Sequence, residues 1–218
     1  MNRVLGVLAG ADMPTALLAE WAGSADLVLA ADGGLDRLLE AGLAPHHMVG
    51  DMDSTENARR LEYLAHDTPF VLHRNADPNT TDCDKLLDLA RKIGVESITL
   101  AGVEGDLLDH TLATIQSALK SGLDVRLALR RGVAWVLSGP KSVAVATVPG
   151  RRVSLIPLGE LSEVDLGGVE WPLSGASMGP RGLTSVSNRA TAKRVSVRVG
   201  SGDALLFVER TEEETPSW

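Results

Sequence analysis

The sequence predicts an α/β domain with a Rossmann-like parallel sheet over residues 1–131, followed by an all-β sandwich domain over residues 132–218. Three observations lead to this fold class. Short apolar runs alternate with amphipathic helical patterns in the first part, as is typical of a parallel sheet covered on both faces. From residue 150 onward, strand-like runs are separated by turn residues without a helical pattern between them. Acidic and glycine residues follow the early strands, where α/β proteins bind ligands.

The elements of the first domain follow from hydrophobic spacing. Strands are expected at residues 3–9, 27–31, 48–49, 70–72, 97–101 and 125–129. Helices are expected at residues 13–22, 35–41, 57–65, 81–93 and 108–120. Asp12 is a candidate N-cap for the first helix and Thr80 or Thr81 for the fourth, while Gly42 and Gly94 are typical helix stops.

The second domain is expected to contain only strands. They are placed at residues 133–137, 142–148, 152–157, 164–166, 184–186, 194–199 and 204–208. Gly139-Pro140 is a turn signal, and Gly200-Ser201-Gly202-Asp203 predicts a hairpin. Residues 211–218 are acidic and contain proline, so we expect a frayed tail.

Composition excludes several classes of partner. The 218 residues are 44% hydrophobic and 23% charged, with a net charge of −8, as expected of a soluble globular protein. The acidic balance argues against binding to nucleic acid or to an anionic membrane, both of which favour clustered Lys and Arg. The single cysteine, Cys83, excludes a disulfide framework and is expected in the core. With neither a leader pattern nor a membrane span, we expect a cytoplasmic protein.

The stretch Gly50-Asp51-Met52-Asp53-Ser54 carries the strongest chemical signal. Two carboxylates one residue apart repel each other at a strand end unless a cation neutralises them. A hard cation such as Mg²⁺, held by carboxylates and substrate phosphates, is one solution. Helix capping by Asp53 or Ser54 is the alternative, but it accounts for only one of the two acids.

Further candidates follow other strands. Gly33-Gly34 after Asp32 is compatible with a tight turn or with a backbone that approaches a phosphate. In Asp77-Pro78-Asn79-Thr80-Thr81-Asp82, the residues read most simply as helix caps, and Asp82 with Lys85 as a surface pair. Because these segments and residues 102–109 all follow strands, we expect them at one edge of the sheet.

Two other segments allow both a structural and a functional interpretation. Gly102-Val103-Glu104-Gly105, with Asp109 and His110, forms a glycine-flanked entry to a helix, where His110 either packs or bonds a nucleotide. In the second domain, Trp171 is either a packing residue or an aromatic platform for a flat, partly cationic ring. Ser187-Asn188 reads most simply as a turn.

Taken in order, these motifs resemble the thiamine pyrophosphokinase (thiamine diphosphokinase) family over nearly the whole chain. The residues that carry the resemblance are Ala31-Asp32-Gly33-Gly34, Gly50-Asp51-Met52-Asp53-Ser54, Asp77, Asn79, Thr81, Asp82, Lys85, Gly102, Gly105, Asp109, His110, Gly168-Val169-Glu170-Trp171-Pro172-Leu173 and Ser187-Asn188. The resemblance implies a nucleotide domain and a thiamine-binding domain in a homodimer. It implies transfer of pyrophosphate from ATP to the thiamine hydroxyl, giving thiamine diphosphate and AMP.

The resemblance also implies roles for particular residues. Asp51, Asp53 and Asp82 would hold Mg²⁺, with Asp32 beside them in the catalytic group. ATP would be bound by Gly33, Gly34, Asp77, Asn79, Thr81, Lys85, Gly102, Gly105, Asp109 and His110. Trp171, Ser187 and Asn188 would lie against thiamine. Asp106-Leu107 departs from the family's usual Gly-Arg and removes a cation expected near phosphate.

Three alternatives remain at this point. A pyrophosphokinase with another acceptor, such as a pterin alcohol, would share the first domain. The stretch Asp51-Met52-Asp53-Ser54-Thr55 also resembles the nucleophile loop of haloacid-dehalogenase-like phosphatases, although the β-rich second half does not suit that class. A thiamine or nucleotide sensor without turnover is the non-enzyme alternative, for which Leu107 is the argument.

Overall fold

The structure is a computed structural model that describes residues 3–51, 70–105, 107–211 and 218. The chain divides into two compact units. Unit 1 comprises Met1–Arg130 with Thr215–Trp218, and unit 2 comprises Arg131–Glu214. The expected helix at residues 57–65 and the acid Asp53 lie outside the described residues.

A parallel sheet forms the centre of unit 1, with the strand order β6-β5-β1-β2-β3-β4. Its strands are β1 (Val4–Val7), β2 (Leu27–Ala31), β3 (His47–Gly50), β4 (Val71–Arg74), β5 (Ser97–Ala101) and β6 (Asp124–Leu129). The central strand β1 is buried along its whole length, as the apolar run predicts. Each apolar run of the first domain therefore became a strand close to its expected position.

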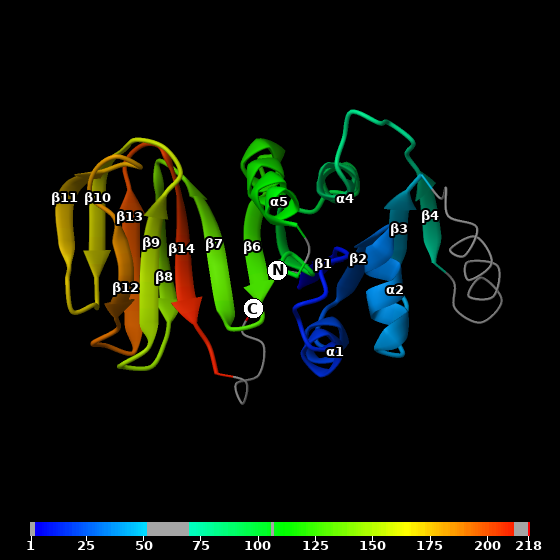
Figure 1. Ribbon diagram of the computed structural model, residues 1–218, viewed down its shortest axis with the longest axis horizontal. Coiled ribbons are helices and arrows are strands. Elements are labelled where there is room, and N and C mark those ends of the chain that lie inside the picture. The colour runs from blue at the N-terminus through cyan, green and yellow to red at the C-terminus, as the bar shows by residue number, and fades with distance from the viewer. Residues whose placement is uncertain (1–2, 52–69, 106, 212–217) are drawn as a thin grey trace. The chain divides into compact units, whose positions relative to one another are not determined.

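Helices cover both faces of this sheet (Figure 1). The helices of unit 1 are α1 (Thr15–Gly23), α2 (Gly33–Glu40), α4 (Asp82–Lys92) and α5 (Leu108–Ser121). Figure 1 shows α1 and α2 together on one face and α4 and α5 together on the other. Thr81 caps α4 through a capping box with Asp84, and this cap fixes where the helix begins.

The expected cap of α1 is wrong. Pro14 occupies the N-cap position, and no side chain caps the helix. The Asp12 backbone N–H instead donates to the Glu104 carbonyl oxygen at 3.2 Å, and the Asp12 carboxylate lies 3.4 Å from the Arg130 guanidinium. Asp12 thus joins the loop after β1 to the loop after β5, which sequence spacing alone does not reveal.

Unit 2 contains two sets of antiparallel strands, which belong to different sheets. The first set has the order β12-β9-β14-β7, and the second has the order β11-β10-β13-β8. Their strands are β7 (Gly132–Ser138), β8 (Lys141–Ala146), β9 (Arg152–Pro157), β10 (Leu161–Gly167), β11 (Leu173–Met178), β12 (Ser185–Arg189), β13 (Arg194–Val199) and β14 (Asp203–Glu209). One hydrophobic core draws residues from both sheets, including Leu155 of β9 and Val197 of β13.

Three local expectations in unit 2 are corrected. Residues 200–203 do not close a hairpin, because β13 and β14 belong to different sheets. Strand β11 was not expected, since its sequence Leu-Ser-Gly-Ala-Ser-Met has weak strand propensity. Ser187-Asn188 is not a turn but part of β12, where a register shift lies between Ser185 and Asn188.

The chain's last residue is anchored to unit 1, which corrects the expected frayed tail at that position. The Trp218 ring packs edge-on against Trp21, with ring centroids 5.1 Å apart. Its Nε1 donates to the Ser24 hydroxyl at 3.0 Å. Within the described residues, none of the helices has the length and apolar character needed to span a bilayer.

Candidate active site

Two acids and a lysine meet at the carboxyl edge of the sheet in unit 1. Asp32 follows β2, and Asp82 is the first residue of α4. Lys85 lies one turn further along α4, and its Nζ is 3.4 Å from Asp82 Oδ1 and 4.0 Å from Asp32 Oδ2. The Lys85 side chain is only 6% exposed. The expected surface pair is therefore wrong: Lys85 is a buried cation shared by two carboxylates.

The acids outnumber the cation, and the pKa of Asp32 reflects this. Burial, a side-chain hydrogen bond with Asp82, and the charges of Asp82 and Asp51 raise the pKa of Asp32 to about 7, although Lys85 acts in the opposite direction. Near neutral pH, the Asp32 carboxyl group is therefore partly protonated. Such a group of oxygen ligands with excess negative charge suits a hard divalent cation.

Gly50 leaves the space that the Asp32 carboxylate occupies. A Cβ atom on Gly50 would contact both carboxylate oxygens of Asp32. The Asp32 backbone N–H donates to the Val49 carbonyl oxygen at 3.2 Å, so the ends of β2 and β3 stay in register here. Asp51 follows Gly50 directly, which places its charge within reach of Asp32. Glycine is thus required at position 50 by the carboxylate of Asp32.

The described residues do not form a complete protein cage for a metal. Among them, no three His, Cys, Asp or Glu side chains gather closely enough to hold an ion. Asp53, the remaining predicted ligand, lies outside the described residues.

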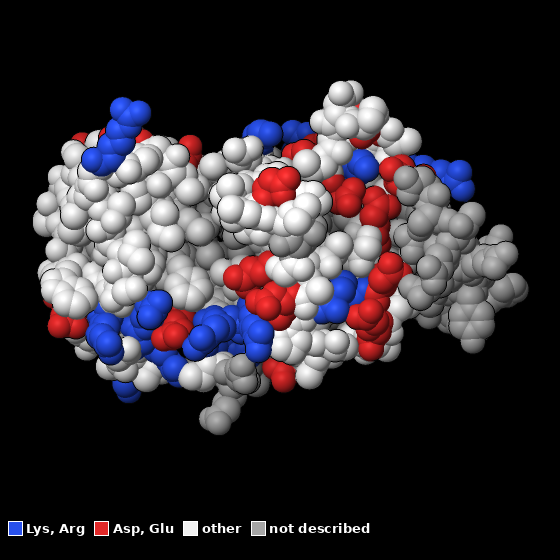
Figure 2. All heavy atoms as spheres, in the orientation of Figure 1, with Lys and Arg blue, Asp and Glu red and all other residues white. Residues whose placement is uncertain are grey.

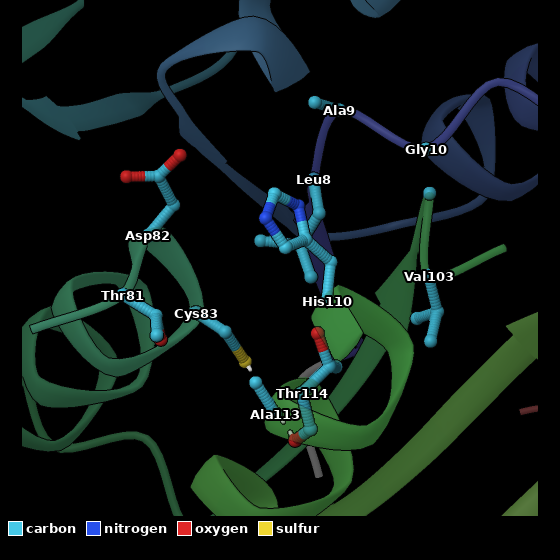
Figure 3. Close-up of a pocket in the computed structure, with 11 residues that line it drawn as sticks. Leu8, Ala9, Gly10, Thr81, Asp82, Cys83, Val103, His110, Ala113 and Thr114 are labelled. Atoms are coloured by element: carbon cyan, nitrogen blue, oxygen red, sulfur yellow. Dashed lines mark hydrogen bonds between the residues drawn. The ribbon is translucent and has the colours of Figure 1, made fainter. Parts of the chain in front are cut away.

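A cavity of about 270 Å³ opens beside Asp82 (Figure 3). It is lined by Leu8, Ala9, Gly10, Thr81, Asp82, Cys83, Gly102, Val103, His110, Ala113 and Thr114. Figure 3 shows Thr81, Asp82 and Cys83 coming from the start of α4, and His110 from the first turn of α5. The wall is largely apolar and backbone, with acidic and imidazole groups at separate places. It suits a ligand with a flat or apolar part and a polar end.

Two loops form one wall of this cavity because their backbones touch. The Gly10 N–H donates to the Gly102 carbonyl oxygen at 2.8 Å. A Cβ on Gly10 would meet the Gly102 and Glu104 carbonyls, and a Cβ on Gly102 would meet the Leu8 carbonyl. Gly102 and Gly105 both have positive φ, of 72° and 94°. The glycines thus allow the two loops to approach each other.

Gly33 and Gly34 serve close packing in the structure. A Cβ on Gly34 would meet the Val7 carbonyl oxygen, and one on Gly33 would meet the Ala9 side chain. The two residues open α2, so their N–H groups lie at a helix N-terminus. Close packing therefore explains why both positions are glycine. The phosphate interpretation remains compatible with the helix end.

Several residues at the predicted site are held by local bonds or by burial. Asp77 Oδ1 accepts from the N–H and Nδ2 of Asn79, at 2.9 and 3.0 Å. Asp109 Oδ1 accepts from the His110 N–H at 3.1 Å. The Thr81 hydroxyl, which does line the cavity, is engaged in the cap with Asp84. Cys83 is buried as expected, and burial raises the pKa of its thiol to about 12.

The predicted aromatic platform in unit 2 is exposed. Trp171 is 57% exposed, while Asn188 is 1% exposed. The Asn188 Nδ2 donates to the Trp171 carbonyl oxygen at 2.8 Å, and the Trp171 N–H donates to Asn188 Oδ1 at 3.2 Å. Ser187, at φ 61°, donates its N–H to the Ser154 hydroxyl at 3.0 Å. These three predicted residues are therefore neighbours.

Sequence reasoning missed part of the cavity wall. Leu8, Ala9 and Gly10 line the cavity, although they were taken only as the end of a strand and its exit. The available signal was a glycine directly after a buried apolar run, which is typical of close backbone approach. The same reasoning also missed Ala113 on α5, whose spacing reads as ordinary helix packing.

Comparison with known proteins identifies the family. The profile of "Thiamin pyrophosphokinase, catalytic domain" matches residues 18–129, and that of "Thiamin pyrophosphokinase, vitamin B1 binding domain" matches residues 142–202. The chain belongs to the thiamin pyrophosphokinase family. The catalytic profile spans β2 to β6, and with them the Asp32–Asp82–Lys85 cluster. The vitamin B1 binding profile spans the segment from Trp171 to Asn188.

Individual thiamine pyrophosphokinases resemble the chain along its length. The Bacillus subtilis thiamine pyrophosphokinase is 26% identical over 96% of this chain and 100% of its own. Thiamine pyrophosphokinase 1 of Arabidopsis thaliana is 28% identical over 81% of this chain and 76% of its own.

Solved structures of family members share the fold. The Bacillus subtilis structure has a TM-score of 0.79 at 24% identity, covering 95% of this chain and 99% of its own. The Candida albicans thiamin pyrophosphokinase has a TM-score of 0.79 at 16% identity, covering 96% and 90%. The chain is thus a family enzyme with a mixed α/β architecture and a separate antiparallel sheet.

Proposed function

We propose that this enzyme transfers a pyrophosphoryl group from ATP to the hydroxyl of thiamine, giving thiamine diphosphate and AMP, and that the reaction requires Mg²⁺. The observation that carries the proposal is the cluster of Asp32, Asp82 and Lys85 beside a cavity in the unit matched by the family's catalytic domain. Pyrophosphoryl transfer depends on positioning and charge neutralisation more than on covalent help. The cluster and the cavity meet these two needs.

The acids would hold Mg²⁺ in the loaded enzyme. Asp51, Asp53 and Asp82 are the proposed ligands, with Asp32 beside them. When bound, the ion neutralises charge that develops on the transferred phosphates. The raised pKa of Asp32 supports this fit, because burial and then the neighbouring acids disfavour its charged form, and a bound cation would offset both effects.

Lys85 has a separate task in this proposal. Its ammonium lies between Asp32 and Asp82 and is almost completely buried. It therefore keeps the two carboxylates at a fixed separation before substrate binds, and it limits their repulsion. Lys85 would also supply positive charge to the phosphates, which Leu107, in place of the family's usual arginine, does not.

The nucleotide would lie along the carboxyl edge of the sheet. We propose that its binding residues are Gly33, Gly34, Asp77, Asn79, Thr81, Lys85, Gly102, Gly105, Asp109 and His110. The cavity lined by Thr81, Gly102 and His110 supports a place for part of the nucleotide. The Asp77–Asn79 bonds support a loop before α4 that is already ordered before the nucleotide binds.

Thiamine would be recognised by unit 2. We propose that Trp171 stacks on a thiamine ring, with Ser187 and Asn188 beside it. The 57% exposure of Trp171 supports this role, because a large exposed aromatic ring offers a flat surface for a partly cationic ring. We further propose a Rossmann-like nucleotide domain over residues 1–131 and a β-sandwich over residues 132–218. The enzyme would act as a cytoplasmic homodimer.

The proposal is tested by identifying the nucleotide product. Purified protein is incubated with Mg²⁺, ATP and thiamine, and the products are separated by anion-exchange chromatography. AMP formed only when thiamine is present supports the proposal. ADP as the product, or no nucleotide product, overturns it.

Acceptor choice is tested in the same assay. A pterin alcohol replaces thiamine at equal concentration, and AMP formation is compared. Faster turnover with the pterin alcohol would move the assignment to a different pyrophosphokinase. Release of phosphate from simple phosphoesters without ATP would favour a phosphatase instead.

A further inference from the structure

The Asn188 side chain occupies the place of a neighbouring strand for Trp171. Both polar atoms of its amide bond the backbone of Trp171. Nδ2 donates to the Trp171 carbonyl oxygen at 2.8 Å, and Oδ1 accepts from the Trp171 N–H at 3.2 Å. A paired donor and acceptor of this kind is what an antiparallel strand offers to the residue opposite. Asn188 therefore extends backbone pairing with a side chain.

Backbone pairing leads up to Trp171 and then stops. Val169 forms a β-bridge with Ala190, and the Glu170 N–H donates to the Arg189 carbonyl at 2.8 Å. The next residue, Trp171, meets the Asn188 side chain. Without this amide, the ladder would end one residue before the indole.

The Asn188 backbone is unavailable for this pairing because it belongs to another strand pair. It is opposite Val153 of β9, after the register shift that begins at Ser185. The bulge includes Ser187 at φ 61°, a conformation that a non-glycine residue rarely adopts. The Ser154 hydroxyl accepts from the Ser187 N–H and holds this bulge. The side chain of Asn188 is thereby left to reach Trp171.

The remaining bonds of Asn188 lock its own orientation. Nδ2 also donates to the Ser185 hydroxyl at 3.2 Å, and Oδ1 also accepts from the Arg189 N–H at 2.8 Å. The side chain is 1% exposed and all its polar capacity is directed inward. A ligand on the surface thus meets the Trp171 indole and not the Asn188 amide.

We infer that Asn188 is a positioning residue, which fixes the Trp171 backbone so that the indole is already presented as a stacking surface before thiamine arrives. This inference rests on the proposed stacking of thiamine on Trp171. A preordered platform binds more tightly because less backbone freedom is lost on binding. The role differs from direct contact with thiamine, which the family resemblance assigned to Asn188.

A double-mutant cycle tests the inference. Kinetics with ATP and thiamine are compared for wild type, Asn188→Ala, Trp171→Ala and the double variant. We expect each single variant to raise the KM for thiamine by about 10-fold, as for the loss of one cation–π contact, with little change in kcat or in the KM for ATP. In the Trp171→Ala background, Asn188→Ala should have no further effect on the thiamine KM.

Two outcomes of the cycle overturn the inference. If Asn188→Ala raises the thiamine KM equally with and without Trp171, Asn188 contacts thiamine directly. If Asn188→Ala leaves the thiamine KM unchanged, it does not position the platform. Ser185→Ala is the matched control, because it removes one bond of the Asn188 amide and neither bond to Trp171; its thiamine KM should stay near wild type.

A measurement on the ligand-free protein keeps the test independent of activity and of variant folding. The protein is labelled with 5-fluorotryptophan, and the Trp171 ¹⁹F signal is assigned by its loss in Trp171→Phe. We expect a dispersed signal without ligand, typical of an ordered ring, that shifts on addition of thiamine. A motionally averaged signal in the ligand-free wild type would overturn preordering, whereas absence of AMP in the assay would overturn only the proposed function.

Discussion

The ammonium of Lys85 lies 4.0 Å from the carboxylate of Asp32, and this contact links the start of α4 to the end of β2. Figure 2 shows acidic residues gathered over this part of unit 1. The buried ammonium of Lys85 limits the repulsion between Asp32 and Asp82 before a divalent ion binds. The contact is therefore the structural basis of the proposed metal site.

Replacing Lys85 should damage both stability and turnover. Lys85→Met keeps the apolar stem but leaves Asp32 and Asp82 without their shared cation. We expect a loss of about 1–3 kcal/mol in the free energy of unfolding, below the value for fully buried pairs because Asp82 is partly exposed. Urea unfolding measures this loss, and the KM for ATP should rise.

Arg91 offers a matched control on the same helix. Its exposed pair with Asp88 has an N–O distance of 2.8 Å. Arg91→Met should change stability by less than about 1 kcal/mol and leave turnover intact. Equal effects of Lys85→Met and Arg91→Met would show that burial of Lys85 has no special role.

Gly50→Ala should displace the Asp32 carboxylate. The new Cβ would occupy the space of the carboxylate oxygens, so we expect overpacking of about 1–3 kcal/mol and a large fall in kcat. Gly23→Ala is the control, because nothing lies within 4 Å of its Cβ position. That substitution should be neutral or stabilising by up to about 1 kcal/mol. Full activity in Gly50→Ala would remove Asp32 from the site.

The stacked pair of His47 and His73 should make unfolding sensitive to mild acid. His47 Nδ1 lies 3.0 Å from His73 Nε2. Burial, followed by the charges of His73 and His46, lowers the pKa of His47 below its usual 6.5. The unfolded state therefore takes up a proton first, and stability should fall as pH drops below about 6.5.

Thermal unfolding between pH 5 and pH 8 checks this expectation. In His73→Gln, which lacks the second imidazole, the midpoint should fall less steeply toward low pH than in wild type. Identical pH profiles for the two proteins would contradict a contribution from the pair.

Trp218 should contribute to the stability of unit 1. Its edge-on contact with Trp21 and its bond to Ser24 are both lost in Trp218→Ala. Aromatic pairs add about 0.5–1.5 kcal/mol beyond the area they bury, so we expect a loss of about 1–2 kcal/mol in denaturant unfolding. Trp218→Phe keeps a ring but loses the Nε1 bond, and it should recover most of this stability. No loss in Trp218→Ala would return the residue to a frayed end.

Local sequence signals predicted the elements of unit 1 because each strand and each helix end is determined by residues that are close together in the sequence. The apolar run at residues 27–31 became β2, and α4 begins after its Thr81 cap and ends before Gly94. The placement of Asp32 and Asp82 at one sheet edge also followed, since parallel strands end together. The family match then rested on the order of these motifs.

Relationships between distant segments were not accessible from local patterns. The spacing of Asp82 and Lys85 is that of an exposed helix pair, and only the approach of β2 reveals Lys85 as buried. Residues 200–203 have the composition of a hairpin, yet sheet choice by β13 and β14 is set by packing across the core. Asn188 looked like a turn residue because its partner, Trp171, is distant in the sequence and lies between β10 and β11.

Transfer of an intact pyrophosphoryl group is tested most directly by following the phosphates of ATP. ATP labelled with ³²P at the β position is incubated with the enzyme, Mg²⁺ and thiamine, and labelled products are separated by chromatography. We expect the label in thiamine diphosphate, with unlabelled AMP formed in equal amount, and we expect Asp51→Asn to abolish both. Labelled ADP, or thiamine compounds without label, would contradict transfer of an intact pyrophosphoryl group at this acidic cluster.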